Sequence, residues 1–193
     1  MILDAPAKIN LSLRVLRRRE DGFHEIATRM APLDLADRIS LTLLPPAAPP
    51  GTVQFTCDDP TVPADETNLA VKAVRALESH TGPLPGVAIH LEKRIPHGAG
   101  LGGGSSDAAT VLKGLNALCS LGLTTETLAR AAASIGSDIP FFLYDSVCDC
   151  GGRGEAVVPV PGFDWHPRPL LIKPPFGVPT PAAYRRWRDS QEV

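Results

Sequence analysis

Residues 96–106, PHGAGLGGGSS, contain five glycines and form the segment of this sequence best suited to bind a phosphate group. Glycine leaves the backbone uncovered, so that its N–H groups can converge on an anion. Ser105 and Ser106 stand where N-cap residues are expected, and the positive end of the following helix would face the same anion. The sequence therefore predicts a phosphate-binding loop made of Pro96, His97, Gly98, Ala99, Gly100, Leu101, Gly102, Gly103, Gly104, Ser105 and Ser106.

A turn or a flexible linker is the alternative interpretation of this loop, because short glycine motifs often meet a conformational need alone. Its neighbours argue against that, since an alternating strand over residues 87–92 leads into the loop and an amphipathic helix over residues 107–119 leaves it. The loop lacks the lysine of the P-loop pattern, and no acidic residue follows at the spacing of a dinucleotide-binding fold. We therefore expect strand, loop and helix to form one anion site.

Alternating and helical hydrophobic patterns place further elements around the loop. In the strand expected over residues 7–15, Lys8 and Asn10 share the polar side and can point into one cleft. Thr67 or Asn68 is a plausible cap for the first helix, with Gly82 beyond its end. The remaining expected elements are strands at 39–44, 52–56 and 170–173, helices at 68–79, 124–135 and 181–188, and a short helix beginning near 137–140.

Composition excludes several classes of function. The 193 residues carry a formal net charge of −2 and 44% hydrophobic residues, a balance that argues against general nucleic-acid binding. No signal-peptide pattern and no run of 18 apolar residues is present, so we expect a cytoplasmic protein without a membrane partner. Its four cysteines are expected to be reduced, and the single residue between Cys148 and Cys150 fits a zinc site poorly.

The segment PHGAGLGGGSSDAA closely resembles the ATP-binding motif of the GHMP kinases. Five other segments resemble one branch of that family, which phosphorylates a methylerythritol linked to cytidine diphosphate on the non-mevalonate route to isoprenoid precursors. They are residues 6–11 (PAKINL), 21–24 (DGFH), 136–142 (GSDIPFF), 152–155 (GRGE) and 174–180 (PPFGVPT). These motifs are spread over nearly the whole chain in the order of the family.

The resemblance implies an α/β (α+β) fold in two parts. Residues 1–160 would form the ATP-binding N-terminal domain, of the ribosomal protein S5-like type, with a mixed sheet and a left-handed βαβ crossover. Residues 161–193 would begin an incomplete C-terminal domain, since the family has a further G-T-G motif in a second domain that this chain does not reach.

The same resemblance implies roles for individual residues. Asp138 would be the general base and Lys8 its partner, because a neighbouring ammonium keeps a carboxylate ionised. Taken singly, these residue types more often have other roles, Asp138 as a helix-capping or turn residue and Lys8 as a solvated strand residue. Asn10 would contact the substrate, and the Ser106 hydroxyl would bind Mg²⁺, which accompanies ATP in such kinases.

Aromatic residues would bind the cytidine. Phe23, where the family more often has tyrosine, would stack on the base, and His24 would add hydrogen bonds to its edge. Phe176 would supply a second wall. Ordinary loop packing explains Phe23 and His24 equally well without the family match, and burial in the core explains Phe176.

Three functions follow as hypotheses. The first is ATP-dependent phosphorylation of the 2-hydroxyl of the cytidine diphosphate-linked methylerythritol by a monomer or weak homodimer. The second is phosphorylation of another small molecule by a related GHMP kinase. The third is a nucleotide-binding fragment without catalysis.

Overall fold

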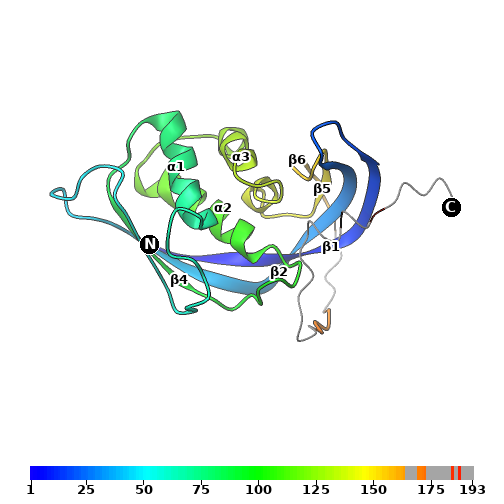
Figure 1. The fold of residues 1–193 in the computed structure, drawn as a ribbon, viewed down its shortest axis with the longest axis horizontal. Coiled ribbons are helices and arrows are strands. Elements are labelled where there is room, and N and C mark those ends of the chain that lie inside the picture. The colour runs from blue at the N-terminus through cyan, green and yellow to red at the C-terminus, as the bar shows by residue number, and fades with distance from the viewer. Residues whose placement is uncertain (164–168, 173–183, 185–186, 188–193) are drawn as a thin grey trace.

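A mixed β-sheet covered on one face by helices forms the body of the protein (Figure 1). The computed structural model describes residues 1–163, 169–172, 184 and 187. The strands are β1 (Ile2–Arg18), β2 (His24–Leu43), β3 (Val53–Cys57), β4 (Val87–Glu92), β5 (Cys148–Gly151) and β6 (Ala156–Pro159). The helices are α1 (Leu69–Thr81), α2 (Gly103–Leu118), α3 (Thr125–Ala133) and the 3₁₀ helix η1 (Pro140–Leu143).

Strand β2 is the centre of the sheet. Antiparallel β1 pairs with one edge of β2, while β4 and β5 pair with different stretches of the other edge. Strand β3 runs parallel to β4, and α1 connects the two, so that both strand directions occur in one sheet. This mixed sheet with a helical layer confirms the fold class expected from the sequence.

The β1–β2 ribbon is longer than the sequence patterns predicted. Only residues 7–15 and 39–44 were expected as strand, whereas β1 and β2 have 17 and 20 residues. The ribbon continues past α2 and bends beside β5 and β6 (Figure 1). Strand β1 contains Pro6 and strand β2 contains Pro32. Proline weakens the sequence pattern of a strand, but it is tolerated where strand pairing is irregular, as it is between Pro6 and Lys8.

Breaks in register decide which side chains of β1 are buried. Pairing with β2 shifts at three places, between Pro6 and Lys8, Asn10 and Ser12, and Val15 and Arg17. Each shift disturbs the alternation of side chains between the two faces. Consecutive Ala7 and Lys8 are consequently both buried, while Leu13 is 49% exposed.

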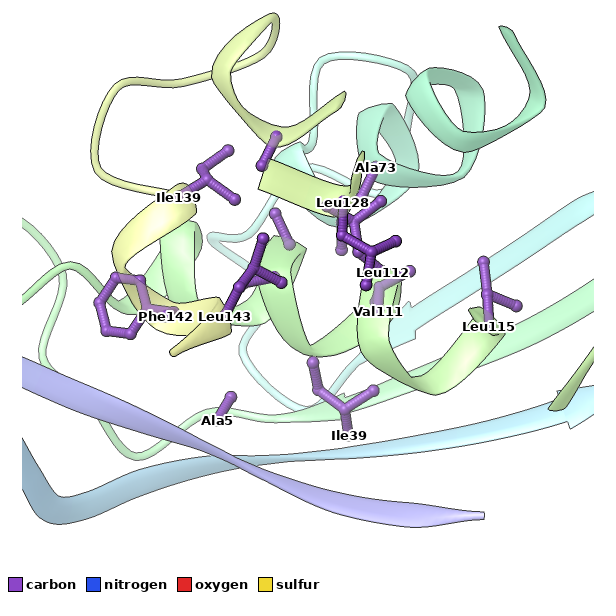
Figure 2. Packing of buried hydrophobic residues seen from close by; sticks show 14 of the residues in the cluster. Ala5, Ile39, Ala73, Val111, Leu112, Leu115, Leu128, Ile139, Phe142 and Leu143 are labelled. Atoms are coloured by element: carbon purple, nitrogen blue, oxygen red, sulfur yellow. The ribbon is translucent and has the colours of Figure 1, made fainter. Parts of the chain in front are cut away.

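The main hydrophobic core lies between the sheet and the helices. Figure 2 shows Val111, Leu112 and Leu115 of α2 above Ile39 of β2, all fully buried. At Gly114 a side chain would collide with those of Leu3 and Leu41, so glycine lets α2 approach the sheet closely. Helix α2 is thereby held directly over β1 and β2, the two strands that carry most of the candidate site.

Helix boundaries agree well with the sequence, with local exceptions. Asn68 caps α1 by accepting from the Ala70 N–H at 2.8 Å, and Gly82 ends that helix with a φ of 84°. Helix α3 ends at Ala133, two residues before the end predicted for the helix at 124–135. Pro140 opens η1 as expected.

The end of the chain is described only in part. Residues 170–172 are exposed and form no strand, so the strand predicted at 170–173 is wrong for them. An extended segment without a paired neighbour gains no ladder hydrogen bonds. Of the helix predicted at 181–188, only Tyr184 and Trp187 belong to the described residues. No helix among the described residues is long and apolar enough to cross a membrane.

Candidate active site

The glycine-rich loop connects β4 to α2 and encloses a small cavity of about 70 Å³, lined by Lys93 and residues 95–104. Its backbone turns through left-handed conformations at Gly98, Gly100 and Gly102, with φ of 65°, 72° and 73°. At Gly102 a Cβ atom would also lie 2.7 Å from Phe142 and 3.1 Å from the Lys8 side chain. Glycine is therefore required at Gly102 for conformation and for space, and at Gly98, where nothing lies within 4 Å, for conformation alone.

Helix α2 begins earlier than the sequence indicated. Gly102 is its N-cap, so Ser105 and Ser106 belong to the first turn and the predicted N-cap role is wrong for both. The sequence could not show this, because serine is a favoured cap and glycine is a poor interior helix residue. The uncapped N–H groups of the first turn remain free to bind an anion beside the loop.

The Ser106 hydroxyl is the polar atom in this turn that best fits a ligand. The side chain is buried, and its Oγ has no hydrogen-bond partner among the described residues. Oδ1 of the adjacent Asp107 is likewise buried without a partner there. Both are hard oxygen donors, the type that Mg²⁺ prefers. The residues present thus suit a magnesium ion accompanying a phosphate.

A buried cluster of three charged residues supports the start of the loop: Asp37 of β2, Lys93 after β4, and Asp107 of α2. The Lys93 ammonium pairs with both carboxylates, at 3.2 Å from Asp107 and in a very short contact with Asp37. All three side chains are at most 7% exposed. Asp37 Oδ1 also accepts from the backbone N–H groups of Arg94 at 2.5 Å and Ile95 at 2.8 Å. The cluster therefore joins β2, α2 and the chain entering the loop.

Within this charged cluster, burial and neighbouring charges shift the pKa values in opposite directions. Burial raises the pKa of Asp107 to about 7, with the Asp37 charge adding to the rise and Lys93 opposing it. Burial also disfavours the charge on Lys93, but the two carboxylates outweigh it and raise the pKa of that lysine. Lys93 consequently stays charged, while the pKa of its partner Asp107 lies near physiological pH.

Lys8 and Asp138, predicted as a pair, lie together. Lys8 Nζ is 3.8 Å from Asp138 Oδ2 and donates to Asn10 Oδ1 at 2.7 Å. Asn10 in turn donates to Thr28 Oγ1 at 2.7 Å, which fixes the amide orientation. Lys8 is 6% exposed, whereas the Asp138 side chain is 40% exposed. Burial lowers the pKa of Lys8, and the Asp138 charge opposes that shift.

The pair adjoins the glycine loop directly. The backbone N–H of Lys8 donates to the carbonyl of Leu101 at 2.9 Å, and the Lys8 side chain packs against Gly102. Asp138 does not cap η1, whose N-cap is Ile139, so the helix-capping interpretation does not hold. An exposed carboxylate next to a buried ammonium, beside a phosphate-sized cavity, can accept a proton from a hydroxyl bound between them.

Phe23 and His24 occupy the tip of the β1–β2 ribbon, after the turn at Gly22. Phe23 is 50% exposed. The His24 ring stacks on Tyr184 at 5.2 Å between centroids, and Trp187 meets its edge at 5.3 Å. Burial raises the pKa of Tyr184, with the Asp138 charge as the second cause, so this phenol lies within the electrostatic reach of Asp138. The predicted Phe176 lies outside the described residues.

Comparisons with known proteins agree with this arrangement. Residues 68–146 match the GHMP kinases N terminal domain family. That part of the chain is similar to the N-terminal domain of GHMP kinases. It is 48% identical over 186 residues to the 4-diphosphocytidyl-2-C-methyl-D-erythritol kinase of Methylacidiphilum infernorum (isolate V4), across 96% of this chain and 63% of that protein. The kinase of the same name from Synechococcus sp. (strain CC9605) is 46% identical, across 98% of this chain and 61% of that protein.

Solved structures of two kinases share the fold. A crystal structure of 4-(cytidine 5'-diphospho)-2C-methyl-D-erythritol kinase superposes with a TM-score of 0.73 at 38% identity, covering 98% of this chain and 65% of that one. Mevalonate kinase of Methanococcus jannaschii has a TM-score of 0.62 at 14% identity and shares the fold alone. The chain thus spans a little less than two thirds of the length of the relatives that bear the erythritol kinase name.

Several residues of this site escaped sequence reasoning. Asp37 and Lys93 belong to no motif that was singled out, although an aspartate inside a strand with buried neighbours is a usable signal. Asp107 lies within the segment PHGAGLGGGSSDAA but was given no role. Thr28 gave no signal, because its role depends on the register between β1 and β2. Tyr184 and Trp187 were placed in a helix without a role, yet both rings pack against His24.

Proposed function

We propose that the protein transfers the γ-phosphoryl group of ATP to the 2-hydroxyl of 4-diphosphocytidyl-2-C-methyl-D-erythritol, on the non-mevalonate route to isoprenoid precursors. The single observation that carries the proposal is the direct contact between the Lys8–Asp138 pair and the glycine loop. Phosphoryl transfer needs a nucleotide phosphate and a proton acceptor held close together. Lys8 contacts both the glycine loop and Asp138, so a phosphate bound by the loop would lie near that carboxylate.

The loop and the first turn of α2 would bind the ATP phosphates through backbone N–H groups. The Ser106 hydroxyl, with Asp107 beside it, would hold Mg²⁺. Magnesium bound there would neutralise charge on the β- and γ-phosphates. The polar atoms without partners in this turn support that assignment.

Asp138 would take the proton from the substrate 2-hydroxyl while the oxygen bonds to the γ-phosphorus and ADP leaves. Lys8 would hold the carboxylate ionised and offset the negative charge that gathers at the phosphoryl group. Asn10 and Thr28 would orient the Lys8 ammonium toward that carboxylate. A positioned general base of this kind contributes roughly 10²–10⁴-fold to the rate.

The cytidine end of the substrate would lie at the tip of the β1–β2 ribbon. Phe23 would stack on the base, and His24 would bond to its edge. Tyr184 would serve as the aromatic wall, supported by its stacking on His24. Phe176 remains a candidate for a further contact.

We further propose that residues 1–160 act as the ATP-binding domain and 161–193 as the start of a second domain, in a monomer or weak homodimer. A kinase for another small alcohol would share the loop and the Lys8–Asp138 pair. The exposed ring of Phe23 beside His24 favours a substrate that carries a base.

The test uses purified protein, ATP, Mg²⁺ and the cytidine diphosphate substrate, with ADP release as the readout. Asp138→Asn should lower turnover by at least about 100-fold while leaving binding of a non-hydrolysable ATP analogue unchanged. Asp145→Asn is the matched control, because that exposed aspartate pairs only with Lys113 among the described residues. Full activity in Asp138→Asn would exclude the base. Binding of the analogue by a wild-type protein without turnover would favour the nucleotide-binding alternative.

A further inference from the structure

Arg153 lies over the ring of Phe23, in a turn to which the proposed chemistry assigns no role. We propose that Arg153 is a positioning residue that holds the Phe23 ring as a fixed stacking surface for the pyrimidine base of the substrate. This inference rests on the proposed function. It gives the GRGE segment, residues 152–155, a part in substrate recognition.

The contact between the two side chains has cation–π geometry. The guanidinium carbon of Arg153 is 4.8 Å from the centroid of the Phe23 ring, within the distance of about 6 Å at which such contacts act. An aromatic ring has two faces, and the guanidinium covers one of them. Half of Phe23 remains exposed, which leaves surface for a planar base to stack on.

Glu155 holds the arginine in place. Its carboxylate accepts from the Arg153 backbone N–H at 2.6 Å and lies 3.5 Å from Arg153 Nε. The carbonyl of Gly152 accepts from the Ile26 N–H at 2.8 Å, two residues beyond His24. The turn is therefore fastened to β2 just beyond the proposed base-binding residues, and the arginine has little freedom to leave the ring.

The same turn also reaches the proposed general base. Gly154 has a φ of 124°, and a Cβ atom there would lie 3.2 Å from Asp138 Oδ1. One short turn thus contacts the stacking residue through Arg153 and lies next to the carboxylate at Gly154. Fixing both relative to each other lowers the ordering cost when a substrate spans them.

The experiment compares binding and turnover in Arg153→Met, which keeps the length of the side chain and removes its charge. Affinity for cytidine diphosphate, measured by calorimetry without ATP, should fall roughly fivefold, and KM for the full substrate should rise by a similar factor. KM for ATP and the melting temperature should not change. Arg153→Lys, which retains a cation, should recover most of the affinity.

Arg29→Met is the matched control. Arg29 also pairs with a carboxylate, Asp149, and also lies over a phenylalanine ring, at 5.6 Å from Phe163. Neither partner belongs to the proposed site, so this variant should bind cytidine diphosphate like the wild type. The double variant Phe23→Leu/Arg153→Met should lose no more affinity for cytidine diphosphate than Phe23→Leu alone. Both substitutions act on the same stacking surface, so their effects should not add.

Three outcomes would overturn the inference and can be told apart. Equal binding of cytidine diphosphate by wild type and Arg153→Met would remove the role of Arg153 and leave the proposed function intact. Absence of binding by the wild type would overturn the proposed function together with the inference. A parallel loss of ATP affinity and melting temperature in Arg153→Met would assign the residue to the stability of the fold.

Discussion

Replacing Asp37 with asparagine should destabilise the protein and weaken its glycine loop. The carboxylate is fully buried and accepts from two backbone N–H groups and from the Lys93 ammonium. An amide oxygen can keep the two backbone bonds, but the amide N–H₂ group then faces an ammonium that has only donors. The Asp37→Asn change therefore removes one partner of a buried ion pair and leaves the other behind.

The magnitude follows from what Lys93 retains. Removing one partner from a buried pair costs about 3–5 kcal/mol, and the remaining contact with Asp107 at 3.2 Å places this case near 3 kcal/mol. For a domain of this size each kcal/mol shifts the melting temperature by about 2–4 °C, so the expected loss is about 6–12 °C. KM for ATP should rise in the same variant, because the lost charge anchors the segment that enters the loop.

Thermal unfolding followed by circular dichroism measures this directly. Asp145→Asn provides the comparison, because its ion pair with Lys113 lies at the surface, where such pairs contribute at most about 1 kcal/mol. A melting temperature of Asp37→Asn within about 2 °C of the wild type would refute the reasoning. It would mean that Lys93 and Asp107 form a sufficient pair by themselves.

Two further predictions concern the same region. Gly102→Ala should lower kcat by at least about tenfold, because its Cβ would displace Phe142 and a misplacement of about 1 Å near reacting groups costs more than that. Gly98 has an equally left-handed backbone but faces open space, so Gly98→Ala should cost only about 1 kcal/mol of stability. Kinetics and urea unfolding of both variants measure these effects. Asp107→Asn should change the dependence of stability on pH. With the pKa of Asp107 raised to about 7 in the fold, its contribution is complete below pH about 4 and is lost as pH rises toward 7, by at most about 4 kcal/mol. Urea unfolding at pH 5 and pH 8 should show the part of this loss that falls above pH 5, at most about 3 kcal/mol, in the wild type and not in the variant. Equal losses in both would contradict the assignment.

The parts of the fold that local sequence determines were predictable. Helix α1 begins after Asn68, whose side chain caps it, and ends at Gly82, whose backbone adopts a positive φ. Pro140 opens η1. The order of strand, glycine loop and helix also follows from adjacent residues. These features depend on interactions within a few positions, which the sequence contains in full.

Features that depend on strand pairing were not predictable. Ala7 and Lys8 are both buried because the register with β2 shifts beside them, and no pattern in β1 alone contains that shift. Asp37 and Lys93 are 56 residues apart, and only the β2–β4 pairing and the chain beyond it bring them together. The proximity of Lys8 and Asp138 was expected from the family resemblance and not from spacing.

The hydrogen bond from the Lys8 backbone to Leu101 has a consequence for the tolerance of the site to movement. The main chain of Lys8 is tied to the glycine loop, and its side chain reaches Asp138. In the proposed reaction, the distance from this part of the loop to the base would therefore depend on one hydrogen bond and one lysine side chain. Flexing of the sheet at Lys8 would carry Leu101 and the Lys8 ammonium together.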